Sequence, residues 1–291
     1  MFNKRGNILF LTLIILTILS ILIIEFSYKI YTSVNAFHNW EQGEKLSYIA
    51  QSGIRLGAKI IEENLILQNK IILSSEDYPQ INKILKENLI IQLEDENAKF
   101  NLNKLISFSG SINEEIYKAF CCLLNQLNLP YQIADRLVDW IDLDHEPRIE
   151  DSEKEAKNAP LDSIDELLII PGISAEVYKK LLPYVTIYGN GLININTAPK
   201  PILMCLSEEI TEDLTRRIVE RRQINPFEKT ADIIKVAGFE RIGLSLIGKI
   251  TVRSSVFCIR SIATIGGIKR EITCILDYSH KPPIVKYWKE V

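Results

Sequence analysis

MFNKRGNILFLTLIILTILSILII, residues 1–24, is the stretch that decides how this chain is built. Lys4 and Arg5 stand before an almost unbroken apolar run from Ile8 to Ile24. A helix needs roughly 17 to 25 apolar residues to cross a bilayer core, and cations before such a helix keep its start in the cytoplasm. The sequence therefore predicts one membrane-spanning helix, with everything after Lys29 on the outer side of the membrane.

An ordinary secretory signal fits this segment poorly. Its apolar stretch is usually about 7 to 15 residues long and ends at a small-residue cleavage site. Here the run is longer and continues through Glu25, Tyr28 and Tyr31. Two alternatives remain: a plain membrane anchor, or a substrate of prepilin peptidase, which cuts after a glycine on the cytoplasmic side of the helix. The step from Lys4 to Gly6 favours the second, with cleavage between Gly6 and Asn7.

Composition excludes some functions. The net charge of -3 and pI near 5.8 give no overall attraction for polyanions. The chain has three histidines and no CxxC or HExxH motif, which argues against a zinc-dependent hydrolase. The sequence also shows no recognisable grouping of a nucleophile, a base and an oxyanion hole. Cys258 and Cys274 lie on neighbouring predicted strands and could pair in an oxidising compartment, with buried free thiols as the alternative.

Periodicity predicts β-structure around a helical interval. Leu46, Ala50 and Ile54 continue one helical face beyond the membrane. Residues 90–93 and 99–102 flank a polar turn and predict a hairpin. At the C-terminus, strands are predicted over 249–253, 256–265, 268–278 and 284–288, with Gly266-Gly267 as a two-residue turn. Residues 111–246 read as helical, and Asn113 and Asp162 are predicted helix caps.

Two glycine turns divide the helical interval in similar contexts. Pro171-Gly172 and Ala237-Gly238 each separate two helical runs, which is typical of paired helix-hairpin-helix units. Such units often bind DNA through amides at the turn, so a membrane-anchored protein that binds DNA or another partner is an alternative function. Acidic residues around the first turn argue against nucleic acid. The basic cluster Arg216, Arg217, Arg221 and Arg222 is more typical of a solvated helix face paired with neighbouring acids.

Residues 139–153 collect carboxylates in a short, turn-rich segment. Ca²⁺ takes about six to eight hard oxygen ligands, and Asp142 and Asp144 could approach one ion if the loop curls. The usual EF-hand loop is not met, because Pro147 stands at its glycine position. The alternative is a solvated acidic loop, with Asp139 as a partner of the helix end.

Several stretches together resemble the general secretion pathway protein K family, the large minor pseudopilins of type II secretion. They are LVDWIDLD at 137–144, NAPLDSIDEL at 158–167, LPYVTIY at 182–188, INTAP within ININTAP at 193–199, DENAKFNLN at 95–103, and the residues before the apolar helix. The resemblance implies an α+β fold, in which a pilin-like long N-terminal helix packs on an antiparallel sheet with a large inserted α-helical domain containing helix-hairpin-helix (SAM-like) units. It also implies bound Ca²⁺, with Asp142, Asp144, Glu150 and Asp151 as ligand candidates.

The same resemblance implies a domain plan and a non-enzymatic role. Residues 1–6 would be a prepilin leader, 7–34 the transmembrane helix, 35–110 the pilin-like helix and first strands, 111–246 the inserted domain, and 247–291 the strands that complete the pilin-like domain. The mature chain would join minor pseudopilins of the I and J type and other type II secretion components at a pseudopilus tip, anchored in the bacterial inner membrane. Its fifth mature residue is Leu11, where ordinary pilins have glutamate, which suits a subunit with none above it. The family begins its mature chain with an apolar residue, whereas Asn7 is polar. This difference would affect the efficiency of cleavage and the methylation of the new terminal amine.

Overall fold

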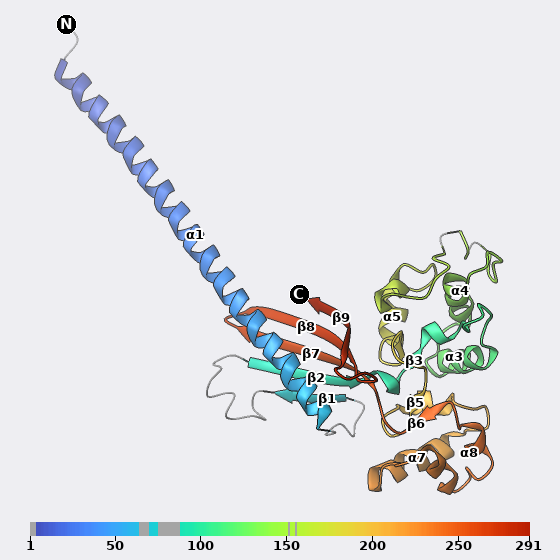
Figure 1. The fold of residues 1–291 in the computed structure, drawn as a ribbon. Coiled ribbons are helices and arrows are strands. Elements are labelled where there is room, and N and C mark those ends of the chain that lie inside the picture. Colours follow the sequence, from blue (N-terminus) through green and yellow to red (C-terminus); the bar gives the residue numbers. More distant parts are fainter. Residues whose placement is uncertain (1–3, 64–69, 75–87, 151, 155) are drawn as a thin grey trace.

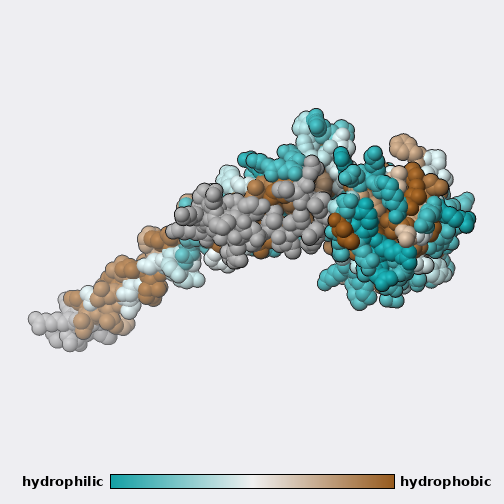
Figure 2. Space-filling view, turned by 90° about the horizontal axis from the view of Figure 1, so that it is seen from below, coloured by the Kyte–Doolittle hydropathy of each residue, from teal (hydrophilic) through white to brown (hydrophobic). Residues whose placement is uncertain are grey.

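A computed structural model describes residues 4–63, 70–74, 88–150, 152–154 and 156–291. Its first element is one long helix, α1 (Lys4–Glu62). The N-terminal half of α1 projects away from the rest of the molecule (Figure 1). From Ile8 the helix is long and apolar enough to cross a membrane, and its apolar window is not buried inside the protein. In Figure 2 this part of α1 is largely brown, whereas the far end of the molecule mixes teal with smaller brown areas.

The second half of α1 packs on a five-stranded antiparallel sheet. The sheet has the strand order β1-β2-β7-β8-β9. Its strands are β1 (Lys70–Ser74), β2 (Asn88–Asp95), β7 (Val256–Ile265), β8 (Ile268–Asp277) and β9 (Ile284–Glu290). Leu46, Ala50 and Ile54 of α1 are buried against Leu93 and Ile259 of the sheet, so the predicted helical face is the face that forms this core.

Two glycines let α1 approach the sheet closely. A Cβ atom at Gly53 would lie 2.1 Å from the Ser261 Oγ, and one at Gly57 would lie 2.8 Å from the Ile259 Cγ2. Real Cβ atoms do not come this close, so a larger residue at either position would require the facing side chains or the helix to shift.

A helical unit is inserted between β2 and β7. Its elements in chain order are η2 (Glu96–Ala98), β3 (Phe100–Asn101), η3 (Leu102–Lys104), α3 (Glu114–Gln126), α4 (Gln132–Ile141), η4 (Ile164–Leu168), α5 (Ala175–Leu181), β4 (Val185–Thr186), β5 (Ile193–Asn194), α6 (Lys200–Met204), α7 (Glu212–Ile224), η5 (Thr230–Lys235), α8 (Ile242–Ser245) and β6 (Ile250–Thr251), where η marks a 3-10 helix. One hydrophobic core runs through this unit from Phe100 to Ile250. In Figure 1 the unit lies at the end of the sheet that is remote from the N-terminus.

The unit begins earlier than the predicted boundary at residue 111, because Phe100, Leu102 and Leu105 already belong to its core. The predicted hairpin over 90–93 and 99–102 is wrong for the same reason. β2 pairs with β1 and β7, whereas β3 pairs in parallel with β4 inside the helical unit. Residues 94–97, which look like a hairpin turn, are the exit from the sheet.

Caps and turns match the predictions in part. The Asn113 side chain accepts the Ile116 amide and caps α3, as predicted. At the second predicted cap the N-cap is Ser163, not Asp162, because Ser163 and Glu166 form a capping box. Gly266 and Gly267 have φ of 53° and 86°, which is the backbone that a tight two-residue turn between β7 and β8 requires.

Candidate metal site

Three carboxylates meet where α4 ends. Asp139 and Asp142 stand three residues apart at the end of α4, so both point to one side of the helix. Glu153 comes from the loop that follows. Oxygens of Asp139, Asp142 and Glu153 all lie within 4.8 Å of one another.

The loop is held in place by one oxygen of Asp139. Its Oδ2 accepts the backbone N–H groups of Arg148 and Ile149 at 3.0 and 3.4 Å, and also the hydroxyl of Ser152. The Arg148 guanidinium lies 3.1 Å from Asp135 on α4, which anchors the loop a second time. The loop therefore closes over the carboxylates without using their remaining oxygens.

Five oxygens here are buried and have no hydrogen-bond partner among the residues that the structure describes. They are Asp139 Oδ1, Asp142 Oδ1, both carboxylate oxygens of Glu153 and the amide oxygen Oδ1 of Asn158. A buried oxygen without a partner costs free energy, and several facing one another repel. Burial and the carboxylates of Asp144, Glu153 and Asp139 raise the pKa of Asp142 to about 6. Burial, followed by the charge of Asp139, also raises the pKa of Glu153. A hard divalent cation would relieve both costs, so this oxygen set fits Ca²⁺.

One of the predicted ligands belongs to this group of carboxylates. Asp142 belongs to the three-carboxylate group, whereas Asp144 and Glu150 do not. Asp144 accepts the Glu146 amide with its Oδ1 and is exposed, and Asp151 lies outside the described residues. Asp139 and Glu153 are not among the ligands predicted from the sequence, where Asp139 appears only in the alternative as a partner of the helix end. The spacing of Asp139 and Asp142 on one helical turn is the signal that could have identified the pair.

At the second glycine turn the backbone amide is already used within the chain. Gly172 and Gly238 have φ of +87° and +91°, as such turns require. The Gly238 amide donates to the Glu240 carboxylate, at 3.0 Å to its Oε2. The first turn is exposed at Gly172, and the Arg136 side chain lies beside it, since a Cβ there would be 2.8 Å from the Arg136 Nε. Each turn joins a 3-10 helix to a short α-helix (η4 to α5, η5 to α8), and its assignment as a helix-hairpin-helix unit stays a prediction.

The basic cluster on α7 is committed to partners within the chain. Arg216 and Arg217 pair with Asp213, and Arg217 also donates to the Ala237 carbonyl at 3.0 Å. Arg222 donates to the carbonyls of Ile195 and Ala198, both at 2.8 Å. Arg221 donates to the Asn225 carbonyl and lies over the Phe227 ring. The predicted pairing with neighbouring acids is confirmed for Asp213, and the other contacts brace the helical unit.

Of the two alternatives for Cys258 and Cys274, the structure has the buried free thiols and not the disulfide, and a different disulfide is present. Cys258 and Cys274 are free and buried. They stand at diagonal positions of β7 and β8, where Cys258 is opposite Ile275 and Cys274 is opposite Ile259. Adjacent positions on a strand point to opposite faces, so the two thiols lie in different cores. Instead, Cys122 of α3 is bonded to Cys205, which follows α6.

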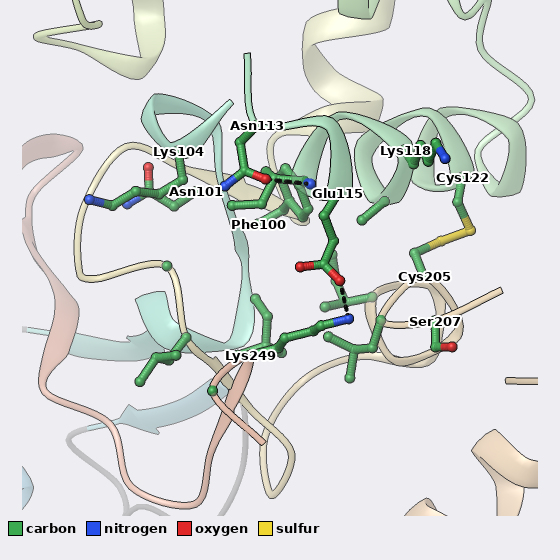
Figure 3. Close-up of a pocket in the computed structure, with 18 of the residues that line it drawn as sticks. Phe100, Asn101, Lys104, Asn113, Glu115, Lys118, Cys122, Cys205, Ser207 and Lys249 are labelled. Carbon is green, nitrogen blue, oxygen red and sulfur yellow. Dashed lines mark hydrogen bonds and ion pairs between the residues drawn. A yellow bond between two sulfur atoms is a disulfide. The ribbon is translucent and has the colours of Figure 1, made fainter. Parts of the chain in front are cut away.

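This disulfide lies beside a cavity of about 820 Å³. The cavity opens between α3 on one side and residues 190–209 with Lys249 on the other. Figure 3 shows Glu115 of α3 reaching toward Lys249, with which it forms an ion pair, and the Cys122–Cys205 bond to the right of this pair. Lys104 and Asn101 lie to the left of the pair in this view. Lysine, glutamate and apolar side chains are mixed in the lining, and this mixture does not select one class of ligand.

A long exposed apolar helix that continues onto an antiparallel sheet, with a helical unit inserted between two strands, defines a pilin-like membrane protein. Comparison with known proteins narrows this class. Two family profiles, both described as "Type II secretion system (T2SS), protein K", match residues 98–190 and 193–253. Together they cover just over half of the chain. The chain belongs to the type II secretion system protein K family.

Individual relatives agree with this assignment. The chain is 25% identical to the type II secretion system protein K of Aeromonas hydrophila, over 94% of this chain and 92% of that protein. It is 29% identical to the protein of the same name from Pseudomonas aeruginosa, where the match spans about half of each chain, 50% of this one and 48% of the relative. A chain in the crystal structure of the GspK-GspI-GspJ complex from enterotoxigenic Escherichia coli shares the fold, with a TM-score of 0.64 over 86% of this chain and 97% of that one, at 22% identity.

Proposed function

We propose that this chain is a minor pseudopilin that forms the tip of a type II secretion pseudopilus and starts its assembly. The observation that carries the proposal is the position of the helical unit at the end of the molecule remote from the N-terminus of α1 (Figure 1). A unit of this size at that end would obstruct a further subunit stacked above it. Leu11 supports the same position, because a subunit at the tip has no neighbour above whose terminal amine would pair with a glutamate there. The role is structural and not catalytic.

Its partners would be minor pseudopilins of the I and J type. The support comes from the GspK-GspI-GspJ complex, in which a chain of the same fold is found. The main domain would face the periplasm and α1 would span the inner membrane. The Cys122–Cys205 disulfide supports this orientation, because disulfides persist in oxidising compartments such as the periplasm. Lys4 and Arg5 support a cytoplasmic start.

Prepilin peptidase would remove residues 1–6, so that the mature chain begins at Asn7. The test is the intact mass of the full chain after coexpression with, and without, an active prepilin peptidase. We expect loss of Met1 to Gly6 only when the peptidase is present, with an added N-terminal methyl group if Asn7 is accepted for methylation. The processed chain should then copurify with the I-type and J-type pseudopilins of the same secretion system.

Two controls make this test decisive. A Gly6→Leu variant should stay uncut, and a known pilin should be cut in the same cells. An uncut wild-type chain beside a cut control pilin would contradict the processing. A cut chain that does not copurify with either pseudopilin would contradict the assembly at the tip.

We infer in addition that Asp139, Asp142 and Glu153 bind Ca²⁺, with Asn158 as a further oxygen donor. Their buried oxygens without partners support this inference. Melting of the full chain in detergent, with calcium and with a chelator, tests it. Calcium at about a hundred times its dissociation constant should stabilise the folded state by roughly 2.7 kcal/mol.

An Asp142→Asn variant should lose this difference, whereas a Glu150→Gln variant should keep it, because Glu150 stands outside the three-carboxylate group. Equal melting temperatures of the wild-type chain in both buffers would rule out the site. An equal loss in the two variants would show that general loop charge, not these ligands, is responsible.

A DNA-binding function is not favoured. The Gly238 amide is taken by Glu240, and the α7 arginines contact their own chain. The second turn and the α7 arginines therefore have their donors engaged within the chain and not directed at a phosphate backbone.

A further inference from the structure

The helical unit is joined to the sheet by two connections that lie side by side. The chain leaves the sheet at Asp95, the last residue of β2, and returns at Val256, the first residue of β7. These strands are neighbours, and Asp95 stands opposite Phe257 in their ladder. Two adjacent connections behave as a hinge, because a rotation about the line between them stretches neither one. The connections alone therefore do not fix how the helical unit is oriented.

A buried carboxylate contacts every segment that meets at this hinge. The Asp95 side chain is fully buried. Its Oδ2 accepts the hydroxyl of Ser254 on the returning connection, and it accepts the Thr197 hydroxyl and the Asn194 amide of the helical unit. Its Oδ1 accepts the backbone N–H of Asn97 at 2.8 Å.

Asn97 makes a second set of contacts across the hinge. Its Oδ1 accepts the backbone N–H groups of Ser255 and Val256 at 2.9 and 3.1 Å. Its Nδ2 donates to the Leu192 carbonyl of the helical unit at 3.4 Å. Asp95 at the end of β2 thus binds both the returning connection and the helical unit, and Asn97 in the first turn of the helical unit binds the returning connection and Leu192.

We propose that Asp95 and Asn97 form an interdomain lock that closes this hinge and fixes the helical unit relative to the sheet and α1. If the hinge opened, the Asp95 carboxylate would lose the Thr197 and Asn194 donors that it has in its buried position. A buried carboxylate without its donors is costly, so the closed orientation is strongly preferred. This inference does not depend on a role in secretion.

The lock also accounts for the polar residues of two sequence stretches to which no binding role has been assigned. DENAKFNLN at 95–103 and ININTAP at 193–199 are brought together at the hinge by these contacts. Further along the first stretch, Asn101 donates to the carbonyls of Tyr188 and Gly189 at 2.8 and 2.9 Å. Glu96 accepts the Thr186 hydroxyl. These polar residues therefore hydrogen-bond segments of the chain to one another.

Hydrogen exchange of the full chain in detergent, read by mass spectrometry, tests the lock. In an Asp95→Ala variant, exchange at residues 192–198 and 252–256 should rise at least about tenfold, while α3 and the centre of β8 stay within about twofold of the wild type. A Thr197→Val variant, which keeps the carboxylate and removes one donor, should show a smaller rise in the same two segments. The Thr197→Val variant alone tests the lock if Asp95→Ala does not fold.

Asp277 provides the matched control. It is the last residue of β8 and its Oδ1 accepts the Ser279 amide, as Asp95 accepts the Asn97 amide at the end of β2. Asp277 also stands opposite Val256 in the β7–β8 ladder and lies 3.7 Å from Lys286, so the comparison uses residues 192–198, where Asp277→Ala should leave exchange unchanged. The lock is overturned if Asp95→Ala and Thr197→Val affect 192–198 no more than Asp277→Ala does. It is also overturned if exchange rises equally throughout both units, because Asp95 would then be a general folding residue.

Discussion

Asp139 shows how a single carboxylate can build a loop and still take part in a site. One of its oxygens accepts the amides of Arg148 and Ile149, while the other stays buried without a partner. Asp142 and Glu153 leave oxygens in the same condition. The loop geometry is therefore satisfied by the protein, and the remaining oxygens are what a cation would use.

Calcium binding should weaken as the pH falls. Without metal, the pKa of Asp142 is raised to about 6, above its ordinary value near 3.8, so its ionisation destabilises the fold as the pH rises through that window. Calcium needs the ionised form, so protons compete with it. The melting-temperature gain from calcium should be large at pH 7.5 and much smaller at pH 5.

Metal-stripped buffers at both pH values, with and without added calcium, provide the measurement. Asp142→Asn should show little gain at either pH. A gain in the wild-type chain that is the same at pH 5 and pH 7.5 would contradict the role of Asp142.

Gly53 should be intolerant of even one added methyl group. Alanine normally stabilises a helix by about 1 kcal/mol relative to glycine. Here the new Cβ would lie 2.1 Å from the Ser261 Oγ, so we expect Gly53→Ala to destabilise the protein, by about 1–3 kcal/mol in urea unfolding. Ser52→Ala, on the exposed face of the same helical turn, should be nearly neutral.

A second substitution checks the cause of this effect. Ser261→Ala removes the atom that the new methyl group meets, so it should recover part of the loss in the Gly53→Ala background. Additive effects of the two substitutions would argue against a direct clash.

At the scale of elements, turns and helix faces could be predicted from the sequence, because each depends on residues that are close together in the chain. Gly266-Gly267 between two β-branched runs predicts the β7–β8 hairpin, and the structure confirms it because the turn needs positive φ at both positions. The helical face of Leu46, Ala50 and Ile54 is confirmed in the same way, since periodicity is a local property.

Long-range pairings could not be predicted in this way. Residues 90–93 and 99–102 look like a hairpin, but β2 finds its partner β7 beyond the helical unit. Cys122 and Cys205 are 83 positions apart, and only the packing of α3 against α6 brings them together. Glu153 was missed because the loop must close before it reaches Asp139 and Asp142.

The disulfide should be a major source of stability for the helical unit. In the chain-entropy view, closing a loop of this length stabilises by about 3–5 kcal/mol. A Cys122→Ser, Cys205→Ser double variant should unfold at correspondingly lower urea concentration. Cys121→Ser, which changes the neighbouring unpaired cysteine, is the matched control.

Reduction offers an independent check of the same prediction. A reductant should lower the stability of the wild-type chain toward that of the double variant and leave the double variant unchanged. Equal urea midpoints for the wild-type chain with and without reductant would contradict the prediction.

At the scale of the whole molecule, charge argues against nucleic acid. The chain carries a formal net charge of -3, and its arginine cluster is used internally. We therefore expect no measurable affinity for a DNA duplex of about 30 base pairs in fluorescence anisotropy at an ionic strength of about 50 mM. At such low salt, non-specific binding by a basic surface would be strongest. Binding that weakens steeply with added salt and is lost in an Arg216→Ala, Arg217→Ala variant would restore the DNA-binding alternative.

The length of α1 has a mechanical consequence. Its 59 residues span about 90 Å at 1.5 Å per residue. Between Asn7 and Gln42 the sequence has no proline or glycine at which the helix would bend easily. If the apolar run Ile8–Ile24 lies in a bilayer, the helix is a stiff lever that pivots there. From the middle of that run to Glu62 the arm is about 70 Å, so a tilt of about 10° would carry the far end sideways by about 12 Å, and the sheet packed on it would follow.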